Sequence, residues 1–465
     1  MTLLTVKIRP WLCFILRAGL ALSCFALVSC SHSHSAEFKP AEARLPPSAT
    51  AAVSVSPSSA QSSSLLEERK SQQTTQPSTQ PQTAEQNTTF DDELVKRAEK
   101  IALLLPTTGQ LSSAARVVIE GFMAARDQDK QRANITAEVQ VYNTDAEPIV
   151  GLYQTAIAQG ATIVVGPIEK EKVAELKAAR NFPVPVLALN YFTEPAPAAA
   201  TNPAQAATPR DKGYFFQFGL AVEDEAEQIA DQAVLEGYQA AAVLYPDSEW
   251  GKRVAQSFMQ RWRKQGGTIA ANLLFSDPAK VAPDLKRLLA PKPGSADAKA
   301  KLRRRQDIDF IFLLATPDQA RQIKPILNFY YAGDIPVYAT SSIYTGTSDP
   351  TRDRDLNGIF FVDQPWLLED DDAMKSFAQS HWPNQSGQTA RLRGLGIDAY
   401  RLQDQLTLFA SSAHTRVQGV TGQLNSDKAR KIHRHLSWAR IHNGMAELMQ
   451  SASDTPEPLT EQNTQ

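Results

Sequence analysis

The chain has 465 residues and a formal net charge of −2, and 42% of its residues are hydrophobic. This length accommodates two or three domains. The near-neutral charge excludes the strongly basic surface with which proteins bind nucleic acid, so we expect no nucleic-acid partner. The three cysteines all lie within residues 1–30, so the rest of the chain has no thiol nucleophile and no disulfide.

The N-terminus has the pattern of an export signal. An apolar run over residues 18–28 follows three basic residues, Lys7, Arg9 and Arg17. The run is too short to span a bilayer, which takes about 20 residues. It ends at Leu27-Val28-Ser29-Cys30, which resembles the lipobox of bacterial lipoproteins. We therefore predict a signal peptide over residues 1–29 and lipidation at Cys30, with a plain secretory signal as the alternative.

Residues 30–93 are dominated by Ser, Pro, Thr, Gln and Ala. Such a segment cannot bury enough apolar surface to offset its conformational entropy, so we predict a disordered tether. As a flexible coil the tether would span roughly 40–50 Å, and fully extended it would reach about 200 Å. His32 and His34 suggest either a metal-binding tail or, more simply, two solvated linker residues. Residues 451–465 are predicted to be a disordered tail.

From Lys100 onward, short apolar runs alternate with amphipathic stretches. We predict strands at residues 101–106, 138–145, 161–167, 184–190, 214–219, 240–245, 268–275, 309–315, 337–341 and 358–363. Helices are predicted at residues 149–159, 169–180, 223–236, 251–265, 281–289, 318–329 and 392–409. An earlier helix is predicted from the spacing of Ala115, Val118, Ile119, Phe122 and Met123, with Ser112 or Ser113 as its cap. This alternation predicts an α/β fold of two Rossmann-like lobes over residues 94–450, each built on a parallel sheet.

Four further segments have features of their own. The Pro- and Ala-rich residues 193–212 and the charged residues 291–306 are predicted to be surface insertions. Asp370, Asp371 and Asp372 are predicted at the start of a helix, where negative charge is favourable. Residues 417–444 alternate in hydrophobicity and are predicted to form one β-hairpin.

Several segments resemble known proteins. Residues 103–125 are similar to the opening of type 1 periplasmic binding proteins, the fold of branched-chain amino-acid receptors. A larger set resembles the LppC family of lipoproteins, the LpoA-like penicillin-binding protein activators: residues 164–176, 187–190, 315–327, 338–344, 354–368, 395–402 and 420–444. The resemblance extends from about Lys100 to Gly444. It implies a type 1 periplasmic-binding-protein fold preceded by the tether.

The resemblance also implies a location and a partner. The protein would be an outer-membrane lipoprotein that faces the periplasm, since Ser31 after the lipidated cysteine favours that membrane. It would stimulate a class A penicillin-binding protein, the enzyme that polymerises and cross-links peptidoglycan. The family usually has an N-terminal helical repeat domain, and in this chain we expect the tether to occupy that place.

Motifs for catalysis are weak throughout the predicted lobes. We find no Ser/His/Asp order and no zinc-spaced cluster, so we expect neither an enzyme nor a metal or cofactor site. Gly394-x-Gly396 lacks the third glycine of a dinucleotide fingerprint and indicates close helix packing instead. His433 and His435 share a strand face, which predicts a solvated face more than a metal pair. Residues 303–305, three arginines, predict a solvated loop or a contact with an anionic partner.

A small-ligand cleft, if present, would lie at the carboxyl ends of the strands between the lobes. Residues in the loops after the strands would then line it: Thr108, Ser112, Gly166, Asn190, Tyr245, Ser341 and Asp363. The alternative is that these residues only cap helices and close turns.

The sequence therefore predicts a non-enzymatic, lipid-anchored regulator of a class A penicillin-binding protein that acts through protein contact. The alternative function is that of a solute-binding lipoprotein, which would capture an amino acid or a cell-wall fragment between its lobes.

Overall fold

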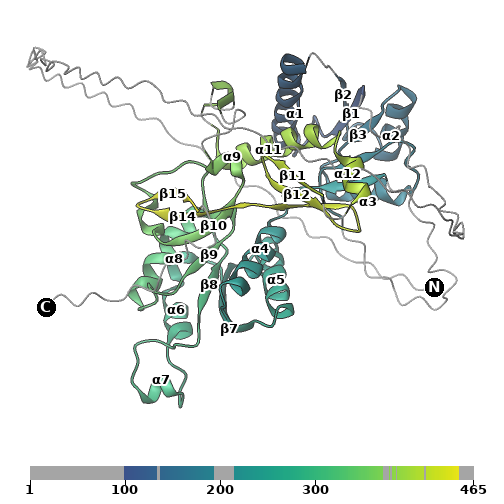
Figure 1. Ribbon diagram of the computed structural model, residues 1–465. Helices are drawn as coiled ribbons and strands as arrows, with labels where there is room; N and C mark the ends of the chain where they lie inside the picture. The colour runs from purple at the N-terminus through teal and green to yellow at the C-terminus, as the bar shows by residue number, and fades with distance from the viewer. Residues whose placement is uncertain are drawn as a thin grey trace, which may run out of the picture. The chain divides into compact units, whose positions relative to one another are not determined.

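The computed structural model describes residues 99–133, 137–192, 214–369, 376–377, 380–383, 385–412 and 415–449. These residues form two α/β lobes, each built on one sheet (Figure 1). The predicted signal peptide, Cys30, the tether, the insertion at residues 193–212, Asp370–Asp372 and the tail at residues 451–465 lie outside the described residues. Among the helices that are described, none is both long and apolar enough to cross a bilayer.

The first lobe has an eight-stranded sheet in the order β11-β12-β13-β5-β4-β3-β1-β2. Its parallel strands are β1 (Lys100–Leu105), β2 (Glu138–Asn143), β3 (Ile163–Val165), β4 (Val186–Ala188) and β5 (Phe215–Phe218). The sheet continues into β11 (Arg416–Gly419), β12 (Gly422–Ser426) and β13 (Lys431–His435). Its helices are α1 (Ser112–Ala133), α2 (Ile149–Ala158), α3 (Lys170–Ala178), α11 (Gly387–Leu402) and α12 (Leu406–Ser411).

The β1 strand shows why the apolar runs are continuous. Leu103 packs into a core that includes residues of α1 and α11, whereas Leu104 packs with residues of α2 and α3 on the other face. Successive side chains of a strand point to opposite faces, so a sheet covered on both sides requires apolar residues at every position. The predicted first β-α step is confirmed by β1 and α1.

The second lobe has a seven-stranded sheet in the order β15-β14-β10-β9-β8-β6-β7. Its strands are β6 (Ala240–Pro246), β7 (Thr268–Phe275), β8 (Phe310–Leu313), β9 (Val337–Ala339), β10 (Ile359–Asp363), β14 (Ser437–His442) and β15 (Met445–Leu448). Its helices are α4 (Val222–Leu235), α5 (Glu249–Lys264), α6 (Ala282–Leu289), α7 (Ala296–Lys299) and α8 (Pro317–Phe329). The short α9 (Pro365–Leu368) follows β10.

Aromatic packing dominates one face of this second sheet. The rings of Phe258 on α5 and Phe312 on β8 stack with centroids 4.1 Å apart, and Trp262 meets Phe310 edge-on at 5.2 Å. The opposite face is covered by α6 and α8, whose residues pack with Leu313. Two separate cores therefore support the second lobe.

Two sequence predictions about the C-terminal region are wrong. The single helix predicted at residues 392–409 is divided into α11 and α12, and the break turns Leu406 and Phe409 into the first lobe's core. The single hairpin predicted at residues 417–444 is instead distributed over both sheets. Strand β13 pairs in parallel with β5, whereas β14 pairs antiparallel with β10. The chain therefore passes from one lobe to the other at Leu436.

The predicted close packing of Gly396 is confirmed. A Cβ atom at this position would lie 2.1 Å from the carbonyl oxygen of Val118 on α1, and a Cβ atom at Gly121 would lie 2.2 Å from that of Arg393 on α11. Because no side chain fits between these backbones, glycine allows α1 and α11 to cross at close range.

Candidate functional site

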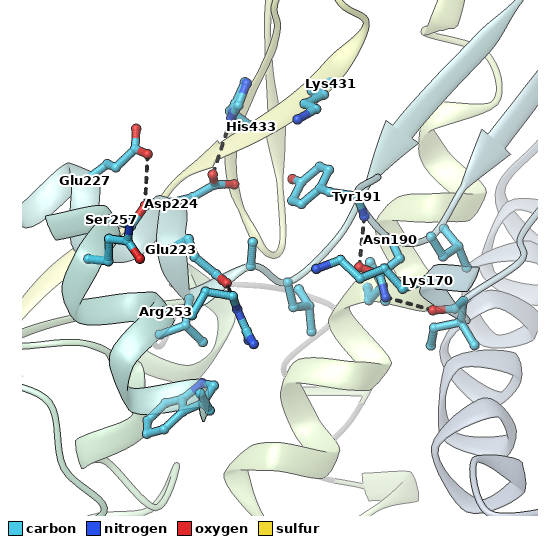
Figure 2. Close-up of a pocket in the computed structure, with 18 of the residues that line it drawn as sticks. Lys170, Asn190, Tyr191, Glu223, Asp224, Glu227, Arg253, Ser257, Lys431 and His433 are labelled. Carbon is cyan, nitrogen blue, oxygen red and sulfur yellow. Dashed lines mark hydrogen bonds and ion pairs between the residues drawn. The ribbon is translucent and has the colours of Figure 1, made fainter. Parts of the chain in front are cut away.

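A cavity of about 750 Å³ opens between residues of the two lobes (Figure 2). The first lobe contributes the loops after β3 and β4, part of α11 and part of β13, and the second lobe contributes α4 and α5. The polar residues of its wall are Lys170, Asn190, Tyr191, Glu223, Asp224, Glu227, Arg253, Gln256, Ser257, Gln260, Lys431 and His433.

On the first-lobe side, internal hydrogen bonds hold the loop after β4. The Asn190 side-chain amide donates to the carbonyl oxygen of Ile168 at 2.8 Å. The Tyr191 hydroxyl donates to the carbonyl oxygen of Ile432 on β13 at 2.6 Å. Lys170 and Lys431 also line this side, and among the described residues neither ammonium group has an ion-pair partner.

On the second-lobe side, α4 and α5 are joined by a ladder of polar contacts. Glu223 pairs with Arg253, and Glu227 accepts a hydrogen bond from Ser257 at 3.2 Å. One turn further on, Asp231 pairs with Arg261 at 2.6 Å. The glutamates on this wall are thus already engaged within the second lobe.

His433 connects the two sides of the cavity. Its Nδ1 lies 3.5 Å from Asp224 Oδ1 on α4, and its Nε2 lies 3.3 Å from Asp427 Oδ2. The hydrogen bond to Asp224 and the nearby Asp427 carboxylate raise the pKa of His433 to about 9 against the opposing effect of burial. The imidazole is therefore cationic at neutral pH. The predicted solvated strand face is wrong for His433, which is ion-paired and partly buried, but is confirmed for His435, which is exposed.

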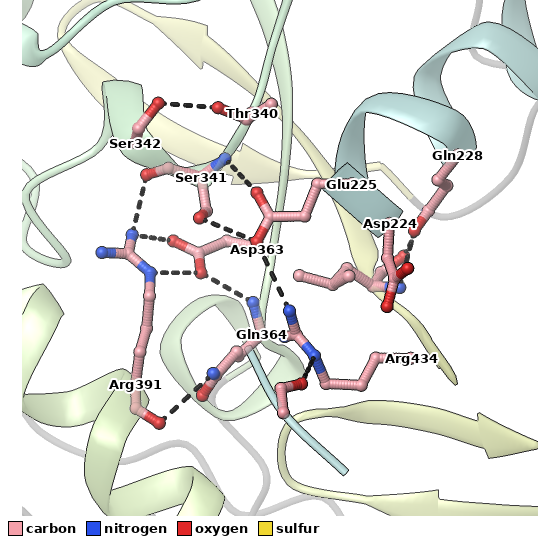
Figure 3. Close-up of polar contacts among 12 residues, drawn as sticks. Asp224, Glu225, Gln228, Thr340, Ser341, Ser342, Asp363, Gln364, Arg391 and Arg434 are labelled. Atoms are coloured by element: carbon pink, nitrogen blue, oxygen red, sulfur yellow. Dashed lines mark hydrogen bonds and ion pairs between the residues drawn. The ribbon is translucent and has the colours of Figure 1, made fainter. Parts of the chain in front are cut away.

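A second polar cluster lies where the chain crosses between the lobes (Figure 3). Buried Glu225 of α4 accepts hydrogen bonds from the Ser341 backbone N–H at 2.9 Å and from its hydroxyl at 3.1 Å. Arg434 of β13 approaches the same carboxylate, with Nη2 3.6 Å from Oε1. Burial raises the pKa of Glu225, and the Arg434 charge opposes that effect.

The other half of this cluster is built around Asp363 at the end of β10. Arg391 of α11 donates from Nε to Asp363 Oδ1 at 2.8 Å and also binds the second carboxylate oxygen. The same guanidinium donates to the carbonyl oxygens of Ser341 at 3.0 Å and Tyr344 at 3.1 Å. The Asp363 side chain is fully buried, so Arg391, and not water, compensates the carboxylate.

Two hydrogen bonds hold the point at which the chain crosses between the lobes, Leu436. The Gln228 amide donates to the carbonyl oxygen of Leu436 at 2.9 Å and accepts from its N–H at 2.9 Å. The three pairs Arg391–Asp363, Arg434–Glu225 and His433–Asp224 share one arrangement: the cation comes from the first lobe and the carboxylate from the second. We call these three pairs and the Gln228–Leu436 bond the hinge network.

The structure separates the seven residues predicted from the sequence to line a cleft. Asn190 lines the cavity. Asp363 belongs to the hinge network, and Ser341 forms hydrogen bonds with two members of that network, Glu225 and Arg391. The remaining four have local roles. Thr108 bonds with Asp145, Ser112 donates to the Gly109 carbonyl oxygen, and Tyr245 packs beside the second lobe's core.

Gly166 has a steric role. It adopts φ = +103°, and a Cβ atom there would lie 2.1 Å from the Leu104 carbonyl oxygen. Ligand binding by any of the seven residues stays a prediction.

Of the polar residues that line the cavity, sequence reasoning identified only Asn190 and missed the others, among them Lys170, Tyr191 and His433. Tyr191 directly follows the predicted Asn190, so proximity could have indicated it. No local signal marks His433, because it reaches the cavity only through the pairing of β13 with β5. Within the described ranges, no three His, Cys, Asp or Glu side chains gather in a way that could hold a metal ion.

Comparison with known proteins identifies relatives of this fold. A family model described as "LppC putative lipoprotein" matches residues 49–444. Proteins named penicillin-binding protein activator LpoA match from Photobacterium profundum, at 28% identity over 364 residues, and from Vibrio cholerae, at 27% over 364 residues. These alignments cover 74% and 75% of this chain but only 56% and 57% of the relatives. The chain thus spans a little over half the length of the relatives that it matches.

Solved structures agree on the architecture. The C-domain of Haemophilus influenzae LpoA, a regulator of PBP1A, superposes with a TM-score of 0.61 at 24% identity over 75% of this chain and 99% of that domain. A Chromobacterium violaceum protein assigned to branched-chain amino-acid ABC transport superposes with a TM-score of 0.56 at 28% identity, covering 73% of this chain and 99% of that protein. The predicted α/β fold of the periplasmic-binding-protein type is confirmed.

Proposed function

We propose that this chain, which belongs to the LppC lipoprotein family, activates a class A penicillin-binding protein through protein contact. The named activators among its relatives support this function. Because the chain spans only part of those relatives, the proposal assigns the activating surface to the two lobes described above. We also propose that the protein is not an enzyme, so its effect on peptidoglycan synthesis is exerted through the synthase.

The hinge network is the observation that most favours a contact module. Receptors of this fold close around a ligand by hinge motion, and such motion requires the segments between the lobes to rearrange. Here those segments carry two arginine–carboxylate pairs whose carboxylates are buried. Separating a buried pair leaves an uncompensated charge, which is strongly unfavourable. The network therefore favours one fixed arrangement of the lobes and a function based on their outer surfaces.

The activation mechanism follows from linkage. A regulator raises activity only if it binds the active conformation of the synthase more tightly than the resting one. We propose that lipidation at Cys30 anchors the chain in the outer membrane facing the periplasm. The tether at residues 30–93 would then keep the lobes within reach of the cell wall and raise their local concentration near the synthase.

A binding experiment tests the proposal. The full chain and a class A penicillin-binding protein from the same bacterium are purified in detergent, and their association is measured by biolayer interferometry. An unrelated lipoprotein of similar size serves as the control for nonspecific association. We expect the full chain to bind the synthase saturably and to show no binding to the control lipoprotein. Equal signals from the synthase and the control would contradict the proposal.

A solute receptor is the second candidate, because the cavity of about 750 Å³ has the size of a small-molecule site. Lys170 and Lys431 are available on one wall, and the Asp224 Oδ2 atom, buried on the other, has no hydrogen-bond partner within the described part of the chain. A carboxylate and an ammonium group on one ligand would match these charges.

Thermal shift assays with amino acids and muropeptides test this candidate. A ligand that binds only the folded state stabilises it by about 2.7 kcal/mol at one hundred times its dissociation constant. We expect the melting temperature to stay unchanged across the panel. A concentration-dependent rise with one compound would establish the receptor function.

A further inference from the structure

One corner of the second lobe exposes large apolar side chains. Phe329 and Tyr331, at the end of α8, are 74% and 52% exposed, and Leu302, after α7, is 42% exposed. The loop that contains α7 projects beyond α6 in Figure 1. Contiguous exposed apolar residues on a folded protein mark candidate interaction sites.

The backbone at Tyr331 is unusual for an exposed aromatic residue. Helix α8 ends with a hydrogen bond from the Ala332 N–H to the Leu327 carbonyl oxygen at 2.9 Å and one from the Tyr331 N–H to the Asn328 carbonyl oxygen at 3.1 Å. This hydrogen-bond pattern places Tyr331 in the left-handed region, at φ = 60°. Glycine is the usual residue there, because a side chain is strained in that conformation.

Glycine occupies this position after three helices of the chain, whereas Arg180 (φ = 56°) and Lys301 (φ = 53°) occupy it after α3 and α7. Gly160, Gly237 and Gly266 occupy the equivalent position after α2, α4 and α5, with φ values of 89°, 82° and 92°. Tyr331 thus replaces a residue that would be less strained, and its ring remains half exposed. Among these three described non-glycine residues, Tyr331 is the one that places an aromatic ring at the surface, which supports a role outside the fold itself.

Arg303 completes the surface. Its guanidinium carbon lies 4.6 Å from the centre of the Tyr331 ring, a cation–π contact that joins the α7 loop to the end of α8. The predicted solvated loop is wrong for the next two arginines. Arg304 binds Asp334 and Arg305 binds Asp307, and both side chains are largely buried.

The charge of this corner differs from that of the whole chain. Residues 291–306 contain six Lys or Arg residues and one Asp, whereas the chain has a net charge of −2. Within the described part of the chain, Lys299, Lys301 and Arg303 are exposed and have no acidic partner. An occupant of this surface must therefore offer both apolar contacts and negative charge.

We propose that Leu302, Arg303, Phe329 and Tyr331, here called the α8-end surface, dock onto an acidic, partly apolar segment of the synthase. The inference rests on the proposed function and names the contact that performs it. Tyrosine, phenylalanine and arginine are enriched in the buried centres of protein–protein interfaces. Leu302 and Phe329 are exposed and apolar, so they match a protein surface better than a polar glycan. The exposed cations beside them match a partner segment that carries negative charge.

The test uses the full chain and the purified synthase. Tyr331→Gly removes the ring and relieves the backbone strain, so we expect the melting temperature to stay the same or rise while the dissociation constant increases roughly tenfold or more. Arg303→Glu is expected to weaken binding further, since it opposes the acidic segment. Leu235→Ala removes a leucine of the same lobe that is 79% exposed and lies outside the α8-end surface, so it is the control, with unchanged affinity expected.

The outcomes separate this inference from the proposed function. Binding by the wild-type chain that is lost in the Tyr331 and Arg303 variants but kept in the Leu235 variant supports the α8-end surface. Equal binding by all four proteins refutes the surface and leaves the proposed function intact. No binding by the wild-type chain overturns both. Sacculi and anionic vesicles are assayed in parallel, and a loss confined to either of them would assign the surface to glycan or lipid and refute the protein contact.

Discussion

Replacing Arg391 with methionine removes the cation that holds the two lobes together at Asp363. The guanidinium binds both Asp363 oxygens and the carbonyl oxygens of Ser341 and Tyr344. Methionine fills much of the same volume but donates no hydrogen bond. The Asp363 side chain is 0% exposed, so water cannot replace the lost partner.

The expected cost follows from that burial. Breaking a buried ion pair by removing one partner costs about 3–5 kcal/mol, because the remaining charge is uncompensated. Arg391→Lys keeps the charge but loses the planar, multidentate geometry, so we expect an intermediate loss of about 1–3 kcal/mol. The double variant Arg391→Met, Asp363→Leu replaces both partners with apolar groups and should recover part of the stability.

Urea unfolding followed by circular dichroism measures these differences through the midpoint and the slope of the transition. Lys280→Met is the control, since Lys280 forms a solvent-exposed ion pair with Asp277 and its loss should leave the free energy of unfolding almost unchanged. A loss below about 1 kcal/mol for Arg391→Met would refute the reasoning that the buried pair holds the lobes in place.

Three further predictions concern the cavity, the helix crossing and the anchor. The pKa of His433 is raised from 6.5 to about 9, so its ion pairs stabilise the fold fully below pH 6.5 and this contribution disappears as the pH rises to 9. His433→Gln should therefore lower the free energy of unfolding by about 1–2 kcal/mol at pH 6, a figure that allows for solvent screening of a side chain that is 36% exposed. At pH 9.5 the variant should differ little from the wild type. A difference that does not depend on pH would contradict this prediction. Gly396→Ala should cost about 1–3 kcal/mol in urea unfolding, whereas Gly151→Ala, with open space around its Cβ position, should stabilise α2 by about 0.5–1 kcal/mol. Equal effects of the two alanines would exclude close packing as the cause. Cys30→Ser should move the protein from the membrane pellet to the soluble periplasmic fraction, and continued sedimentation would disprove lipidation at Cys30.

Much of the fold could be predicted because its signals are local. The buried run at β1 and the amphipathic run of α1 are each determined by neighbouring residues, and the same holds for most later strands and helices. The hairpin prediction failed because the alternation from Ile432 to Ile441 is the same whether the strands pair with each other or with different sheets. The pairing is decided by distant partners, since Gln228 and Leu436 are 208 residues apart.

The candidate site was predictable only in part for a similar reason. Ser341 comes shortly after β9 and Asp363 is the last residue of β10, and these parallel strands place both residues at the carboxyl edge of the second sheet. Whether such residues line a cavity depends on which side chains of the other lobe contact them. Arg391 of the first lobe forms hydrogen bonds with both residues. Asn190 instead donates to the Ile168 carbonyl oxygen of its own lobe and lines the cavity.

The proposed function is that this chain raises the activity of a class A penicillin-binding protein. The most direct measurement is the rate at which the purified synthase polymerises and cross-links lipid-linked peptidoglycan precursor, with and without the full chain. We expect a rate that increases with the concentration of the chain and saturates once the synthase is fully bound. An unchanged rate under conditions in which the two proteins demonstrably bind each other would contradict it.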